Sequence, residues 1–271
     1  MSHNLDLPRF TAVDMAYPLA YTESGTGTPL LLIHGSLCDY RYWRWQFAAF
    51  GDKYRTLAPS LRGYWPAAFH SERADFDVLV QTDDLIEFVN AVNPGNDPIH
   101  ILGHSRGARV ALELACAMPA RTRTLILADP GFPTDARAEP SAFQVEAARR
   151  LRAGDIDGAL QLFVDSVSGA DTWRHMVGWF KTMVRDNAGT LLSQIGERNQ
   201  QFDLARARVI SCPTMLLTGE YSPPRFRDVL AALGQTLPRT QRATIPLASH
   251  GMNLGNPRAF NQHVLEFLDK H

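Results

Sequence analysis

The chain has 271 residues, of which 45% are hydrophobic, and its 27 basic and 28 acidic side chains give a formal net charge of −1. A chain of this length can bury one sizeable core and still hold an inserted segment. A charge so close to zero excludes a strong electrostatic attraction to nucleic acid or to an anionic membrane. We therefore expect a small-molecule substrate, and neither nucleic acid nor a membrane as a partner.

The amino-terminal residues lack a charged segment followed by an apolar core, and no apolar run approaches the ~18 residues that span a bilayer. These features predict a soluble, cytoplasmic protein. The three cysteines, at positions 38, 116 and 212, are too few and too irregularly spaced for a disulfide framework or a zinc site. We expect free thiols and no bound metal. The sequence leaves the oligomeric state open between a monomer and a homodimer.

Short apolar runs bounded by turn residues recur along the chain and predict strands that are buried on both faces. In chain order they are PLLLIHG, YRTLAPS, PIHILGHS, TRTLILADP, CPTMLLTGE and RATIPLASH. Segments of helical pattern separate them, at 42–50, 76–92, 106–118, 226–233 and 257–270. Strands alternating with helices in this way predict an α/β fold, in which helices cover both faces of a mostly parallel sheet.

The alternation is interrupted at 132–208, where no strand-like run appears. One helical face is indicated there by the spacing of Trp173, Met176, Val177, Phe180 and Val184. We expect 132–208 to form a helical cap, inserted after the sixth strand into a core domain made of 1–131 and 209–271.

The sequence GHSRG, from Gly103 to Gly107, matches the motif G-x-S-x-G and lies between a predicted strand and a predicted helix. A turn this tight forces Ser105 into a strained backbone conformation and exposes its hydroxyl. The start of the helix directs unpaired N–H groups toward that oxygen. The sequence therefore predicts that Ser105 is a catalytic nucleophile.

A second predicted strand ends at His34-Gly35, in LLIHGSLCDYRYW. Because glycine permits a sharp turn, the amide of Ser36 can face Ser105 and join the amide of Arg106 in an oxyanion hole. The same region suggests side chains that bind the substrate. The expected substrate-binding residues are Leu37, Cys38 and His104 from the core, and Trp173 and Trp179 from the cap.

His250 follows the last predicted strand, in LASHGMNLGNPRAF, and precedes a helix that begins near Pro257. A histidine at this place can reach across the strand ends to Ser105. As general base it would take the serine proton and later return it to the leaving group.

These three pieces together resemble the α/β-hydrolase family, in which an oxyanion turn, a nucleophile elbow and a catalytic histidine occur in this order. The resemblance covers nearly the whole chain, and HGSLCDYRYW, APSLRGYWP and GHSRG are similar to a group of bacterial hydrolases of undefined substrate. It implies a mostly parallel, twisted sheet of eight strands and catalysis without a metal or an organic cofactor.

The acid of the triad departs from the family pattern. In most members an aspartate ends the seventh strand, but here Ser222 stands at that position, in TGEYSPP. A hydroxyl cannot offset an imidazolium, so another carboxylate is needed. Glu220 and Asp129 are the two alternatives. We favour Asp129, at the end of the sixth strand, because some family members take their acid from there.

The resemblance implies a serine hydrolase that cleaves a small to medium, apolar or aromatic carboxylic ester or lactone through an acyl-enzyme on Ser105. Epoxide hydrolases and haloalkane dehalogenases are disfavoured, since those relatives carry aspartate at the nucleophile position. Hydrolysis of a C–C bond in a diketone and cofactor-free oxygenation stay open as alternatives on the same fold. A non-catalytic ligand-binding sensor is an alternative of another class, which steady turnover would argue against.

Overall fold

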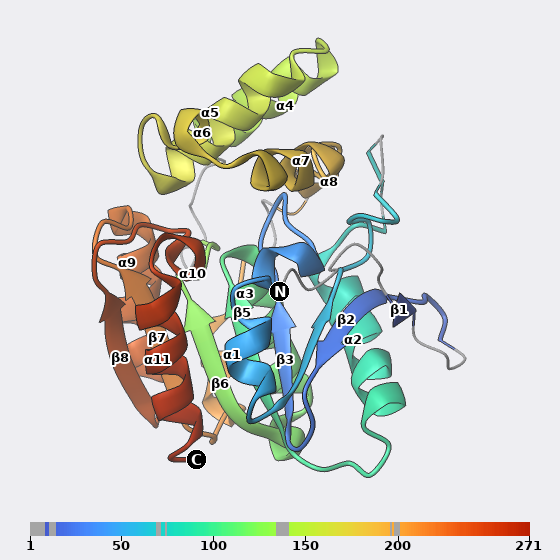
Figure 1. The fold of residues 1–271 in the computed structure, drawn as a ribbon, viewed down its shortest axis with the longest axis vertical. Helices are drawn as coiled ribbons and strands as arrows, with labels where there is room; N and C mark the ends of the chain where they lie inside the picture. Colours follow the sequence, from blue (N-terminus) through green and yellow to red (C-terminus); the bar gives the residue numbers. More distant parts are fainter. Residues whose placement is uncertain are drawn as a thin grey trace.

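The computed structural model describes residues 9–10, 15–68, 72–73, 75–133, 141–195, 197 and 201–271. Within them, eight strands form one sheet in the order β1-β2-β4-β3-β5-β6-β7-β8, with helices on both faces (Figure 1). Strands β3 to β8 pair in parallel, whereas β1 and β2 are antiparallel to their neighbours. The predicted α/β fold class and eight-stranded sheet are confirmed.

Strands β3 to β8 occupy the six apolar runs that the sequence singles out, whereas β1 and β2 lie before the first of them. Their bounds are β1 (Arg9–Phe10), β2 (Ala20–Ser24), β3 (Pro29–Ile33), β4 (Arg55–Pro59), β5 (Ile99–His104), β6 (Thr122–Ala128), β7 (Thr214–Gly219) and β8 (Thr240–Ile245). Strands β3 and β5 are buried along their whole length because helices cover them on both sides. Strand β8 lies at the edge of the sheet and is largely open to solvent.

Two apolar cores lie on opposite faces of the sheet. Helices α1 (Phe47–Gly51) and α11 (Pro257–Leu268) pack on one face, with Phe50 and Phe260 fully buried. Helices α2 (Val78–Val92), α3 (Arg106–Ala117) and α9 (Pro224–Thr236) cover the other. Short helical turns in the described residues include η1 (Tyr40–Trp43), η2 (Pro119–Arg121), η4 (Leu204–Val209) and α10 (Met252–Gly255).

The helix predicted at 42–50 is divided in the structure into η1 and α1. The carboxylate of Asp39 accepts a hydrogen bond from the amide of Arg41, which starts a short 3-10 turn before α1 begins at Phe47. The chain is therefore brought around the carboxyl end of β3 by two short helical pieces instead of one.

In the described part of the chain between β6 and β7, five α-helices form a layer beyond the carboxyl ends of the strands (Figure 1). They are α4 (Ala142–Arg152), α5 (Ile156–Ser168), α6 (Thr172–His175), α7 (Gly178–Asp186) and α8 (Thr190–Gln194), and we call them the cap helices. They lie within the predicted cap at 132–208, of which 134–140, 196 and 198–200 are outside the described residues. The division into a cap and a core of 1–131 and 209–271 stays a prediction.

The register of the central strands places the site. Gly103 of β5 pairs with Ile33 of β3 on one side and with Leu127 of β6 on the other. The three strands therefore end at nearly the same level, and the residues that follow them meet below the cap helices. None of the helices in the described part of the chain has the length and apolar character that crossing a membrane requires.

Candidate active site

Ser105 forms the turn between β5 and α3, with φ 56° and ψ −123°. L residues rarely adopt this conformation, and it survives only where the surroundings impose it. Here the amide of Ser105 donates to the carbonyl of Ala128 at 2.9 Å, and α3 packs closely behind. A Cβ on Gly107 would lie 2.2 Å from the carbonyl oxygen of His34, so only glycine permits this approach. The predicted elbow is present and directs the hydroxyl of Ser105 into a pocket.

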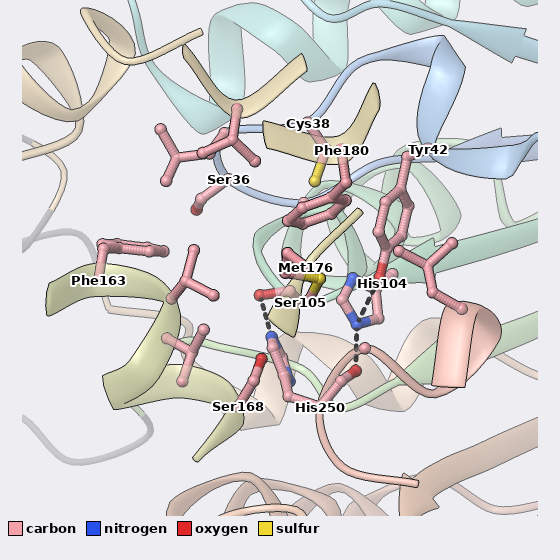
Figure 2. Close-up of a pocket in the computed structure, with 17 residues that line it drawn as sticks. Ser36, Cys38, Tyr42, His104, Ser105, Phe163, Ser168, Met176, Phe180 and His250 are labelled. Atoms are coloured by element: carbon pink, nitrogen blue, oxygen red, sulfur yellow. Dashed lines mark hydrogen bonds between the residues drawn. The ribbon is translucent and has the colours of Figure 1, made fainter. Parts of the chain in front are cut away.

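His250 connects Ser105 to a carboxylate. Its Nε2 lies 3.0 Å from Ser105 Oγ (Figure 2), and its Nδ1 lies 3.2 Å from Oδ2 of Asp129. The side chain of His250 is 6% exposed and that of Asp129 is fully buried. Both distances are within the reach expected between a nucleophile, its base and the group that orients the base. Ser105, His250 and Asp129 thus form one hydrogen-bonded chain.

Asp129 directly follows β6, and its backbone and side chain are both fixed by β7. Its φ of 42° turns the chain away from the sheet, while its amide donates to the carbonyl of Leu217 at 2.9 Å. The hydroxyl of Ser222 donates to Asp129 Oδ2 at 2.5 Å and accepts a hydrogen bond from the amide of Gly219 at 3.1 Å. The serine at the usual acid position therefore contacts the carboxylate from the neighbouring strand.

Glu220, the alternative acid, points elsewhere. Its carboxylate accepts a hydrogen bond of 2.7 Å from the amide of Leu247, and its side chain is exposed. Of the two carboxylates that the sequence left open, the structure brings only Asp129 into contact with His250.

The loop after β3 lies against the elbow. A Cβ on Gly35 would be 2.9 Å from Cβ of Ser105, so the chain passes as close as glycine allows. Leu37 has a φ of 61°, a strained value for a residue other than glycine. Arg106 is the first residue of α3, and an amide at that position has no partner within the helix. Ser36 and Arg106 therefore flank Ser105, while the role of their amides in an oxyanion hole stays a prediction.

The side chain of Arg106 is buried and faces away from any substrate. It forms an ion pair with Glu197 and donates to Oε1 of Gln81 at 2.6 Å. Glu197 follows α8, the last cap helix. The ion pair therefore holds this end of the cap helices against the first turn of α3.

The pocket in front of Ser105 encloses about 500 Å³ of empty space, including its open mouth. The predicted site residues that line it are Ser36, Leu37, Cys38, His104, Ser105 and His250 (Figure 2). From the cap helices it receives Phe163, Val164, Val167, Met176, Phe180 and Val184. Most of this surface is apolar.

Trp173 and Trp179, predicted to bind substrate, do not line the pocket. Trp173 is 7% exposed and lies under the cationic groups of Lys181 and Arg185. The guanidinium of Arg44 lies 4.4 Å from the ring centroid of Trp179. The predicted helical face is interrupted at Met176 and Val177, which have extended backbone between α6 and α7, and Val177 is 55% exposed. Met176, Phe180 and Val184 of the predicted set reach the pocket.

Three buried side chains near the base and the pocket, those of His104, Cys38 and Tyr42, are held uncharged by burial. Burial, together with the neighbouring charge of His250, lowers the pKa of His104 well below its usual value. Burial also raises the pKa of the Cys38 thiol and the Tyr42 phenol well above their usual values. His104 Nε2 donates to the backbone carbonyl of His250 at 2.8 Å, which identifies the nitrogen that carries its proton.

One contact to the base has no counterpart in the sequence analysis. The ring of Phe226, in the first turn of α9, stacks on the imidazole of His250 with centroids 4.0 Å apart and planes 10° from parallel. The sequence indicates Phe226 only as the start of a helix, because helical spacing does not show which distant side chain a buried ring contacts.

Known proteins resemble this chain over most of its length at low sequence identity. The chain is 26% identical over 249 residues to the dihydrolipoyllysine-residue acetyltransferase component of the acetoin cleaving system of Pseudomonas putida, which covers 90% of this chain and 64% of that protein. It is 23% identical over 253 residues to the (E)-2-((N-methylformamido)methylene)succinate hydrolase of Acinetobacter baylyi, covering 92% and 93%. The chain thus spans just under two thirds of the first relative and nearly all of the second.

Among solved structures, the enol-lactonase from Burkholderia xenovorans LB400 matches with a TM-score of 0.78 at 19% identity, over 96% of this chain and 100% of that one. At this identity the likeness shows the fold alone. A sequence model described as the alpha/beta hydrolase family matches residues 30–263. Since that match spans most of the chain, including Ser105, Asp129 and His250, the chain belongs to the alpha/beta hydrolase family.

Proposed function

We propose that this protein is a serine hydrolase that cleaves a carboxylic ester or lactone through an acyl-enzyme on Ser105. The observation that carries the proposal is the buried hydrogen-bonded chain from Ser105 Oγ through His250 to Asp129, which opens on an apolar pocket. A nucleophile, a base and an orienting carboxylate in this order can perform acyl transfer.

In the proposed reaction, His250 Nε2 takes the proton of Ser105 as Oγ attacks the ester carbonyl carbon. The amides of Ser36 and Arg106 donate to the oxygen that becomes negative. The imidazolium, stabilised by Asp129, then protonates the departing alkoxide oxygen, and the acyl group stays on Oγ. Water, activated by the same imidazole, attacks the acyl carbon and restores the serine.

The pocket supports an apolar, uncharged substrate. Its described lining includes no Lys, Arg, Asp or Glu side chain, and the cap helices contribute aliphatic and aromatic groups. Sites of this kind bind ligands mainly by burial of apolar surface, with a few polar groups that fix orientation. We propose that 132–208 acts as a cap whose helices form the roof of this pocket and set the size of the acyl group.

The test combines turnover with labelling. A panel of p-nitrophenyl esters and lactones of graded chain length should be hydrolysed, and a fluorophosphonate should attach to Ser105, as located by mass spectrometry. The Ser105→Ala protein should fold normally and lose both properties. Attachment to Ser36 or Ser222 would contradict the assignment of the nucleophile, and tight ligand retention with negligible turnover would favour a binding sensor.

A further inference from the structure

The imidazole of His250 is fixed in space by more than its two hydrogen bonds. Besides the stacked ring of Phe226, the ring of His104 lies 4.6 Å away at a tilt of 41°. Phe226 is 3% exposed, so its position is set by the surrounding structure. A Cβ on Gly131 would lie 3.5 Å from Phe226 Cε1 and 3.3 Å from Ser105 Oγ, so the phenyl ring and the nucleophile both lie close to this glycine.

The segment that carries Phe226 is rigid. Pro223 and Pro224 precede it, and proline fixes φ near the value that the first turn of a helix requires. The amide of Phe226 donates to the carbonyl of Pro223 at 3.1 Å, which closes this turn. The residues SPPRF thus begin with the hydroxyl that contacts Asp129 and end with the ring that covers His250.

We propose that Phe226 is a positioning residue for His250, whose ring keeps the imidazole directed at Ser105 and stabilises its protonated form. The inference rests on the proposed function of His250 as the base. A phenyl ring face attracts a cation placed over it, and a near-parallel stack at 4.0 Å also resists tilting of the imidazole. Both effects favour proton transfer in the intended geometry.

Other titratable groups lie near the same imidazole, and their effect on its protonation must be separated from the effect of the Phe226 ring. Asp129 contacts Nδ1 through its Oδ2, whereas burial keeps His104 uncharged and Tyr42 protonated. The guanidinium of Arg225 lies 4.8 Å from the Phe226 ring centroid and donates to the carbonyl of Ser166. These groups are chemically unchanged in both Phe226→Leu and Phe226→Tyr, so the difference between those two variants reports the aromatic ring.

The test is an NMR titration of the His250 imidazole in the full chain, with its signals assigned from His250→Gln. In Phe226→Leu we expect the protonation midpoint to fall by roughly half a pH unit, because loss of the ring makes the imidazolium less stable. Phe226→Tyr, which keeps an aromatic face, should restore the midpoint. Phe88→Leu is the matched control, since Phe88 is a buried ring that packs against Tyr21, in the core beneath α2.

Kinetics supply a second measurement. Phe226→Leu should lower kcat by roughly tenfold with KM nearly unchanged, because a displaced base impairs the reaction more than binding. A midpoint in folded Phe226→Leu that equals or exceeds that of the unchanged protein overturns the proposal, as does the same shift in Phe88→Leu. A protein that shows the expected shift but neither turnover nor labelling of Ser105 would retain this inference and lose the proposed function.

Discussion

Ser222 Oγ donates a hydrogen bond of 2.5 Å to Oδ2 of Asp129, the same oxygen that faces His250 Nδ1. The amide of Gly219 donates to that hydroxyl, so the serine hydrogen is left to point at the carboxylate. The residue at the tip of β7 therefore still acts on the triad, although the acid comes from β6. A hydroxyl donor there gives a buried carboxylate oxygen a hydrogen-bond partner, as buried polar atoms require.

Asp129→Asn should lower kcat on the order of 10⁴-fold with the fold kept, because a neutral amide neither sets the imidazole tautomer nor stabilises the imidazolium. Glu220→Gln is the matched control, since its carboxylate contacts only the amide of Leu247 and should matter little. The measurement is kcat on one activated ester, with circular dichroism as the check on folding. An inactive Glu220→Gln beside an active Asp129→Asn would show that the acid is Glu220.

Ser222→Ala removes the donor to Asp129 without removing the carboxylate. A hydrogen bond to a buried charged group contributes about 1.5 to 3 kcal/mol, so the free energy of unfolding should fall by that amount. We expect kcat to fall by roughly tenfold, which is about 1.4 kcal/mol of barrier height. Urea denaturation and steady-state kinetics measure the two effects, and an unchanged stability would contradict the importance of this contact.

The adjacent tips of β6 and β7 also predict a rescue. In Asp129→Asn, the further change Ser222→Asp returns a carboxylate to the position that most of the family uses, beside the one that was lost. Part of the lost kcat should return in the double variant. Ser222→Asp alone should be harmful, because two carboxylates at hydrogen-bond distance cannot both stay charged. Rescue by Ser222→Asn to the same extent would point to a cause other than charge.

Buried histidines should make the fold sensitive to acid. Burial, with a smaller contribution from the charge of Arg106, lowers the pKa of His34 to about 3, and its Nε2 accepts a hydrogen bond from the amide of Leu61. Between the unfolded value of about 6.5 and the folded value, the unfolded chain binds one more proton than the native one. Stability is therefore fully present above that range and declines as the pH falls, by about 1.4 kcal/mol per pH unit for this group.

His34→Gln tests the origin of this decline, because glutamine can still accept from Leu61 but does not take up a proton. Urea denaturation at about pH 7 and about pH 5 should show a smaller loss of stability in the variant than in the unchanged protein. His175→Gln, at an exposed position in the cap helices, serves as the control and should leave the pH dependence as it was. An equal decline in all three proteins would exclude His34 as the source.

The parts of the site that the sequence predicts are those in which local backbone geometry restricts the residue type. The elbow needs Gly103 and Gly107 around Ser105, and the strand ends bring Ser105, Asp129 and His250 to one edge of the sheet whatever the helices do. The contact of Phe226 with His250 depends on how α9 packs beside a turn that is distant from it in the sequence. Met176 takes its place in the pocket where the chain leaves helical geometry between α6 and α7. The spacing of apolar residues indicates which face of a helix is buried, but not which part of the protein packs against that face. These contacts could therefore not be predicted.

Met176 lies between two cap helices and contributes to the pocket in front of Ser105. The side chain of Met176 lines the pocket and is only partly buried. Met176→Ala should therefore lengthen the space beyond Ser105 at little cost to the stability of the fold. We expect the ratio of kcat/KM for a long acyl ester to that for a short one to rise by about tenfold. This is the size of effect expected when added methylene groups of the substrate fill an apolar pocket. Trp179→Ala, in the neighbouring helix α7 but outside the pocket, is the control and should change all esters alike. If Trp179→Ala alters the ranking of the esters and Met176→Ala does not, the substrate enters along the face under Arg44 and the pocket described above is not where the acyl chain lies.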